Sequence, residues 1–192
     1  MMTALWVTGL MVVATIAGVR VSRSEDAVPE GRGALVRSVA YWVLTLVITF
    51  ELAAGALWDL LHIEYVRVVL AHLGYPMYLL IILGVWRIPG ALAILVPRFP
   101  RLKEWAYAGA FFNYSGAAAS HFLAGDSAAK WAGPLVLSVF TLISWALRPA
   151  SRRLPGQATS ERRVEAWVVP VAIVAAMLVV GFFTMPKGAP PQ

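Results

Sequence analysis

The stretch AWVVPVAIVAAMLVVGFFTMP, at residues 166–186, contains 21 residues and no charged side chain. An α-helix needs about 20 such residues to cross the hydrocarbon core of a bilayer. Similar apolar runs recur along the chain, in which 60% of the 192 residues are hydrophobic and 14% are charged. Soluble domains contain about 25% charged residues. The sequence therefore predicts an integral membrane protein in contact with the lipid bilayer.

The apolar runs predict an all-α polytopic membrane bundle with about six spans. The predicted spans are residues 1–19, 38–58, 73–97, 105–123, 131–147 and 166–186. Residues 59–72 mix apolar and charged residues, and this segment is too short and too polar to span. We expect it to form a helical connector at the membrane interface.

The spans and loops give the predicted domain organisation. It consists of an N-terminal transmembrane helix (1–19), a loop (20–37), a four-helix membrane domain (38–148), a second loop (149–165), a C-terminal transmembrane helix (166–186) and a disordered tail (187–192). The first segment is interpreted as a retained helix. A removed signal peptide is the alternative, although its basic start and small-residue cleavage site are not evident.

The basic residues predict the orientation in the membrane. Residues 20–37, 98–104 and 148–165 hold 12 of the 16 lysines and arginines. Six spans place these three loops on one side, which the positive-inside rule makes cytoplasmic, with both termini outside. Short basic clusters between apolar runs are not the pattern of a nucleic-acid-binding face, so no nucleic-acid partner is predicted. The chain has no cysteine, which excludes disulfides and thiolate metal sites.

Two charged residues lie within predicted spans. Inserting such a group costs about 2.5–3.5 kcal/mol, so each one calls for a physical reason. Glu51 and Arg87 lie at similar depths, about 15–20 Å above the cytoplasmic boundary at the usual helical rise. We predict a Glu51–Arg87 ion pair. A structural pair that fixes helix register, a ligand site and the absence of a contact remain open.

Two stripes of small and polar residues run toward the outer side. The first contains Glu51, Gly55, Asp59 and His62. These residues share one helical face if the helix continues unbroken to the last of them. The second contains Gly109, Asn113, Ala117 and His121. It should point inward, because small and polar residues form helix interfaces in membranes.

The two stripes predict a pocket in the outer half of the bundle, with Arg87 at its floor. The alternative is a tightly packed bundle in which these side chains bond one another. The candidate ligand-binding residues are Glu51, Asp59, His62, Arg87, Asn113 and His121. Histidines and carboxylates gather at the outer end, but no HxxxH or HExxH spacing occurs, so no metal site is predicted.

The middle of the chain resembles the DoxX-like family of small bacterial membrane proteins. The matching segments are YWVLTLVITFELAAGALWDL (41–60), HLGYP (72–76), LVPRFPRLKEWAYAGAFF (95–112) and SHFLAGD (120–126). The resemblance implies a four-helix core with both ends in the cytoplasm, in a bacterial inner membrane. Some family members are associated with thiosulfate:quinone oxidoreductase or with membrane-anchored oxidative-stress complexes. A quinone is therefore the candidate cofactor, and a redox protein is the candidate partner.

Three functions remain open at this point. The first is a redox-accessory or quinone-associated membrane subunit. The second is a small enzyme or carrier for an apolar ligand, with Glu51, Asn113 and His121 as acid/base or orienting groups. The third is a structural or assembly protein. No catalytic residue is assigned.

Overall fold

The computed structural model describes residues 15–16, 32–97, 99–149, 152–154 and 165–188. These residues contain helices and no strand, which confirms the all-α class. The helices are α2 (Arg32–Leu60), α3 (Glu64–His72), α4 (Tyr78–Leu95), α5 (Pro100–Leu123), α6 (Ala128–Leu147) and α7 (Glu165–Phe183). Of the predicted first span, residues 15 and 16 are described, and they are helical. Residues 20–31, most of the loop 149–165 and the end of the predicted tail lie outside the described residues.

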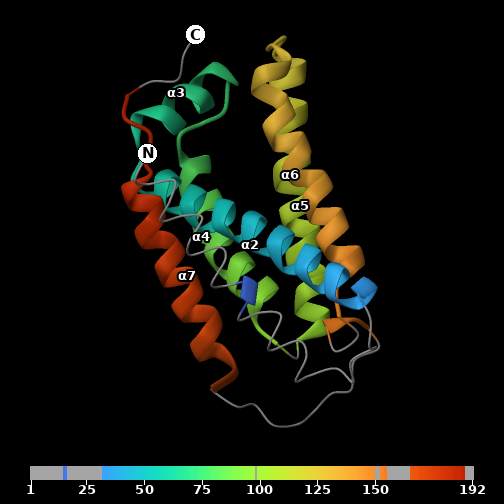
Figure 1. The fold of residues 1–192 in the computed structure, drawn as a ribbon. Coiled ribbons are helices and arrows are strands. Elements are labelled where there is room, and N and C mark those ends of the chain that lie inside the picture. Colours follow the sequence, from blue (N-terminus) through green and yellow to red (C-terminus); the bar gives the residue numbers. More distant parts are fainter. Residues whose placement is uncertain (1–14, 17–31, 98, 150–151, 155–164, 189–192) are drawn as a thin grey trace.

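The long helix α2 is the centre of the bundle. It packs against α4, α6 and α7, and α5 packs against α6 and α4. Figure 1 shows α2 passing obliquely between α7 on one side and the α5–α6 pair on the other. The core forms where these helices meet. Its buried side chains include Leu46, Ile48 and Leu52 of α2, Ile94 of α4, Tyr107 of α5 and Met177 of α7.

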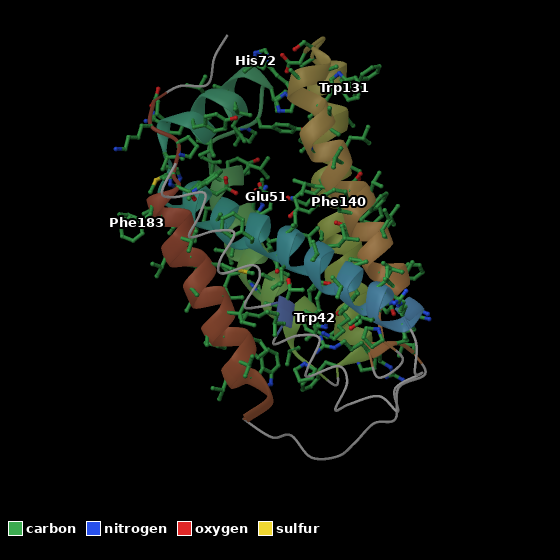
Figure 2. The ribbon with its side chains drawn as sticks, viewed as in Figure 1. Trp42, Glu51, His72, Trp131, Phe140 and Phe183 are labelled. Atoms are coloured by element: carbon green, nitrogen blue, oxygen red, sulfur yellow. The ribbon has the colours of Figure 1, made fainter. Side chains whose placement is uncertain are left out.

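Several helices are long and apolar enough to cross a membrane. By length and composition, α2, α4 and α6 meet this requirement, and Trp167–Phe183 is a shorter apolar helix. Large apolar side chains also face outward: Trp86 and Phe183 are each 72% exposed, and Figure 2 shows Phe183 pointing away from the bundle. Soluble monomers rarely expose large contiguous apolar patches. These features are those of a membrane protein.

Some helix ends differ from the expected ones. Residues 32–37 belong to α2 rather than to a loop, and α5 begins at Pro100, five residues before the predicted span. Proline at the first helical position is favourable, because the missing N–H has no intrahelical partner there. The connector is helical as predicted, but shorter: α3 starts at Glu64 and buries Leu70. Asp59, expected at the start of the connector, is a buried residue near the end of α2.

Basic residues near the predicted loops have structural partners at helix ends. The Lys103 ammonium is buried and donates to the carbonyl oxygens of Ala93 and Ile94, at 3.1 and 2.6 Å, where α4 ends. Arg153 donates to the carbonyl oxygen of Ala146, at 2.6 Å, where α6 ends. The last carbonyls of a helix have no intrahelical donor and carry partial negative charge, so cations stabilise them.

Candidate functional site

Arg87 joins three helices in the interior of the bundle. Its side chain is 19% exposed, and Nη1 donates to Oδ2 of Asp59, on α2, at 2.8 Å. Its Nε and Nη2 donate to Oδ1 of Asn113, on α5, at 3.4 and 3.3 Å. We call Glu51, Asp59, Arg87 and Asn113 the Arg87 cluster. The cluster places a cation, two carboxyl groups and an amide together within the helices.

Gly55 makes room for the Arg87 guanidinium on α2. A Cβ atom at this position would lie 2.5 Å from Nη1 of Arg87 and 3.8 Å from Oε1 of Glu51. The guanidinium therefore covers Gly55, with Glu51 one turn before it and Asp59 one turn after it on the same helix. A larger residue at position 55 would displace the arginine from this position.

The ion pair of Arg87 is not the predicted one. Within the described residues its carboxylate partner is Asp59, whereas Glu51 lies nearby without forming an ion pair. Asp59 lies just beyond the predicted second span, which ends at Trp58, so the sequence offers Glu51 as the charge within the span. Because α2 continues to Leu60, Asp59 lies on the buried face of this helix, where it forms the ion pair with Arg87.

Two polar groups of the Arg87 cluster lack partners. In the described part of the chain, the Glu51 carboxylate accepts no hydrogen bond, and Nδ2 of Asn113 is buried and donates none. The amide orientation follows from Arg87, which can only donate and so faces the amide oxygen. A buried donor left without an acceptor costs about 1–3 kcal/mol. A bound group with an acceptor oxygen would remove this cost.

His62 lies outside the Arg87 cluster. It follows the end of α2 with a φ of 49°, and its Nδ1 lies 3.0 Å from the carbonyl oxygen of Leu60. The first stripe included His62 only if the helix continued unbroken to it, and α2 ends at Leu60, so this condition is not met. Glu51, Gly55 and Asp59 remain on one face because they precede the helix end.

His121 belongs to a second group, at the end of the bundle where Figure 2 labels His72 and Trp131. His121 Nδ1 lies 2.7 Å from Oδ2 of Asp126, His72 Nε2 lies 3.0 Å from Oδ1, and the Lys130 ammonium donates to Oδ1 at 3.1 Å. The hydrogen bond from His121 contributes most to holding the pKa of Asp126 well below its usual range, and Lys130 and His72 lower it further. We call these four residues the Asp126 cluster.

A metal site is not evident in either cluster. Within the described residues, no group of three or more histidine, aspartate or glutamate side chains is arranged to hold a metal ion. In the Asp126 cluster the carboxylate oxygens are engaged by two imidazoles and an ammonium. This group connects the end of α3 to α5 and to the start of α6.

The inner face of α5 differs from the predicted stripe. Its buried residues are Lys103, Tyr107, Ala110, Tyr114 and Ala118. Gly109 is exposed, with open space where a Cβ would be, so the inward direction expected for its stripe is wrong at this position. The tyrosines turn inward because their hydroxyls find partners there: Tyr114 donates to the carbonyl oxygen of Ile48 at 3.0 Å.

A buried hydroxyl group was not foreseen from the sequence. Ser144 Oγ lies 2.8 Å from Thr45 Oγ1 and 2.9 Å from Tyr107 OH, which links α6 to α2 and α5. The tyrosines at 107 and 114, seven residues apart on one face of a helix, were the available signal. These hydroxyls are satisfied by protein groups, so they offer no free hydrogen-bonding capacity to a ligand, in contrast to Nδ2 of Asn113 in the Arg87 cluster.

The comparison with known families decides the relationship of this chain. The model of the DoxX-like family matches residues 43–144, which is more than half of the sequence. The chain belongs to the DoxX-like family. The match includes Asp59, Arg87 and Asn113, so the Arg87 cluster lies within the family region of this DoxX-like protein. No curated protein and no solved structure matches the chain.

Proposed function

We propose that this DoxX-like membrane protein is a quinone-associated, redox-accessory subunit whose ligand head group binds at the Arg87 cluster. One observation carries the proposal: among the described residues, the buried Nδ2 of Asn113 has no acceptor, and the Glu51 carboxyl group lies close to Gly55, which the Arg87 guanidinium covers. A buried donor without an acceptor, next to a carboxyl group in an apolar surrounding, fits a ligand that is itself mostly apolar and carries a few polar atoms.

The chemistry of a quinone matches these groups. Its carbonyl oxygens accept hydrogen bonds, as Nδ2 of Asn113 requires, and its apolar tail is soluble in the bilayer. A bound quinone would supply two-electron chemistry coupled to proton uptake. Glu51 would hold or deliver a proton at the head group, because a carboxyl within hydrogen-bond reach can act as an acid or a base. A redox protein that docks to the bundle would supply the electrons.

The membrane arrangement is also part of the proposal. We infer six spans in a bacterial inner membrane, with the basic loops in the cytoplasm and both termini outside. The distribution of lysine and arginine along the sequence supports this orientation. The exposed apolar side chains of α2, α4, α6 and α7 support contact with lipid.

Extraction of bound lipid tests the proposal directly. The full-length protein is purified from membranes in mild detergent, and quinone per protein is measured by chromatography with ultraviolet detection. We expect quinone near one per chain in the parent protein and a clear loss in Asn113→Ala. The matched control is Ser115→Ala, which removes a hydroxyl on the same helix that bonds locally to the carbonyl oxygen of Phe111.

The outcomes separate the remaining functions. A protein that purifies without quinone and without an associated oxidoreductase contradicts the redox proposal. A different apolar molecule lost in Asn113→Ala would favour the enzyme or carrier function, built on Glu51 and Asn113, since His121 bonds Asp126 instead. A structural role is favoured by one observation, that Arg87 connects α2, α4 and α5. It predicts lower stability of Asn113→Ala with no change in bound lipid.

A further inference from the structure

Arginines gather at the end of the bundle where α2 begins and α6 ends. We call Arg37, Arg148, Arg152 and Arg153 the basic end. Figure 2 shows side-chain nitrogens concentrated where these two helix ends meet. Arg37 is exposed on the second turn of α2, and the other three follow the last residue of α6. This group lies at the opposite end of α2 from the Arg87 and Asp59 pair.

The internal contacts of the basic end hold it in a fixed arrangement. Arg148 donates from Nη2 to Oε1 of Glu104 at 2.8 Å, and its guanidinium lies over the rings of Tyr107 and Trp145 at 5.2 and 5.3 Å. Arg153 donates from Nε to the carbonyl oxygen of Arg148 at 2.6 Å. The guanidinium groups of Arg148 and Arg153 are therefore positioned by the fold rather than left free on long side chains.

Two arginines of the basic end have no carboxylate partner among the described residues. Arg37 and Arg153 form no ion pair there, whereas Glu104 pairs with Arg148 at 2.8 Å. Nη1 of Arg148 is buried and has no hydrogen-bond partner in the described part of the chain. The Arg152 guanidinium lies over the ring of Trp42 on α2, at 5.0 Å, which brings the residues after α6 beside the first half of α2. Burial lowers the pKa of Arg153, and the charges of Arg37 and Arg148 lower it further. Clustered cations of this kind are stabilised by an anion.

The surroundings of the basic end identify the anion. Val36, next to Arg37, is 66% exposed, and Ile143 and Trp145, in the last five residues of α6, are also exposed. An apolar outer surface that borders clustered arginines at a helix end matches a lipid with acyl chains and a negative head group. A soluble anion would use the charges and leave the apolar border without a role.

We propose that the basic end binds the phosphate head group of an anionic phospholipid, with Arg37 and Arg153 beside the phosphate and Val36 and Ile143 beside the acyl chains. The site is separate from the Arg87 cluster, so it does not depend on the quinone proposal. Bound lipid would neutralise the charges of Arg37 and Arg153 and hold α2 and α6 together where they meet. The lipid would belong to the leaflet that faces the basic loops.

Native mass spectrometry of the full-length protein in detergent provides the test. The protein is titrated with phosphatidylglycerol and, separately, with phosphatidylcholine of the same acyl chains. We expect tighter binding of phosphatidylglycerol and an approximately fivefold loss of affinity in Arg37→Gln, from about 1 kcal/mol per basic residue near an anionic lipid. Arg37→Glu should lose more, because it places a negative charge beside the head group.

The controls separate lipid binding from other sources of the effect. Arg67→Gln removes an exposed arginine on α3, paired with Glu64 at 3.7 Å, and should leave phosphatidylglycerol binding unchanged. Equal losses in Arg67→Gln and Arg37→Gln would show general charge attraction and overturn the proposal. Millimolar inorganic phosphate should not displace phosphatidylglycerol. Displacement by phosphate would assign the site to a free anion, and equal binding of the two lipids would also overturn the proposal.

Discussion

Nη1 of Arg87 donates to Oδ2 of Asp59 at 2.8 Å, which ties the middle of α4 to the end of α2. Both side chains are largely withdrawn from solvent. A charge in such a place is costly alone, and a partner with the opposite charge offsets the cost. The pair therefore explains how two ionised groups are accommodated among apolar helices, and it makes the arrangement sensitive to loss of either partner.

We predict that Asp59→Asn and Arg87→Gln each lower stability by about 3–5 kcal/mol, because each leaves an uncompensated buried charge. The double variant should lose less than the sum, because both charges are removed. Denaturation of the four proteins in detergent gives the coupling. Glu51→Gln is the comparison, since Glu51 does not pair with Arg87 among the described residues, and its coupling to Arg87→Gln should be weaker. Additive losses for Asp59 and Arg87 would contradict the pair.

A second prediction concerns Gly55. In Gly55→Ala the new Cβ would lie 2.5 Å from Nη1 of Arg87, so the guanidinium must move away from Asp59. Overpacking of this kind costs about 1–3 kcal/mol. Gly109→Ala is the matched control, because the space around Gly109 is open and its stability should be unchanged or rise by up to about 1 kcal/mol. Equal melting temperatures for the two variants would show that Arg87 does not depend on Gly55.

The sequence was sufficient to predict the class of fold. It was not sufficient to predict which face of each helix packs into the bundle. Long apolar runs predict helices because hydrophobic content and length are local properties. The choice between Asp59 and Glu51 as the partner of Arg87 depends on where α2 ends. His62 follows that helix end, so it does not share the helical face of Glu51 and Asp59. The inner face of α5 was also missed. Small residues at positions 109 and 117 suggested one face, whereas Tyr107 and Tyr114 find hydroxyl partners on another. Such partners come from other helices and leave no local pattern.

Lys103 provides a third prediction. Its ammonium donates to the carbonyl oxygens of Ala93 and Ile94, at the end of α4. Lys103→Met keeps most of the side-chain length and removes both bonds. We expect a loss of about 1.5–3 kcal/mol, the range for hydrogen bonds to charged groups. Arg101→Gln, an exposed basic residue two positions earlier, should melt like the parent protein. A Lys103→Met variant of parental stability would show that the carbonyls find other donors.

The Asp126 cluster predicts a dependence of stability on pH. The pKa of Asp126 is held below its usual value, chiefly by the hydrogen bond from His121. A carboxyl whose pKa is lowered by folding contributes stability above its unfolded pKa, about 3.9, and loses it as the pH falls through the folded pKa. The melting temperature of the parent protein should therefore exceed that of Asp126→Asn at neutral pH, and the difference should shrink below about pH 4.

Glu64→Gln is the control for this dependence. Glu64 lies on α3 and is exposed. Its replacement should therefore leave the fall of the melting temperature at acidic pH as it is in the parent protein. A difference between the parent protein and Asp126→Asn that persists unchanged down to low pH would mean that the carboxylate charge of Asp126 does not stabilise the fold.

The proposed orientation predicts the labelling of single cysteines. The chain has no cysteine of its own, so maleimide labelling of the protein reports on the introduced thiol alone. Gln157→Cys lies in the loop 149–165, whose arginines should hold it in the cytoplasm, and Lys187→Cys lies beyond α7, on the predicted outer side. A membrane-impermeant maleimide added to intact cells should label Lys187→Cys and should label Gln157→Cys after permeabilisation. The reverse pattern would mean that the protein has the opposite orientation in the membrane. Equal labelling of both sites in intact cells would mean that α7 does not cross the bilayer, since the two positions flank that helix.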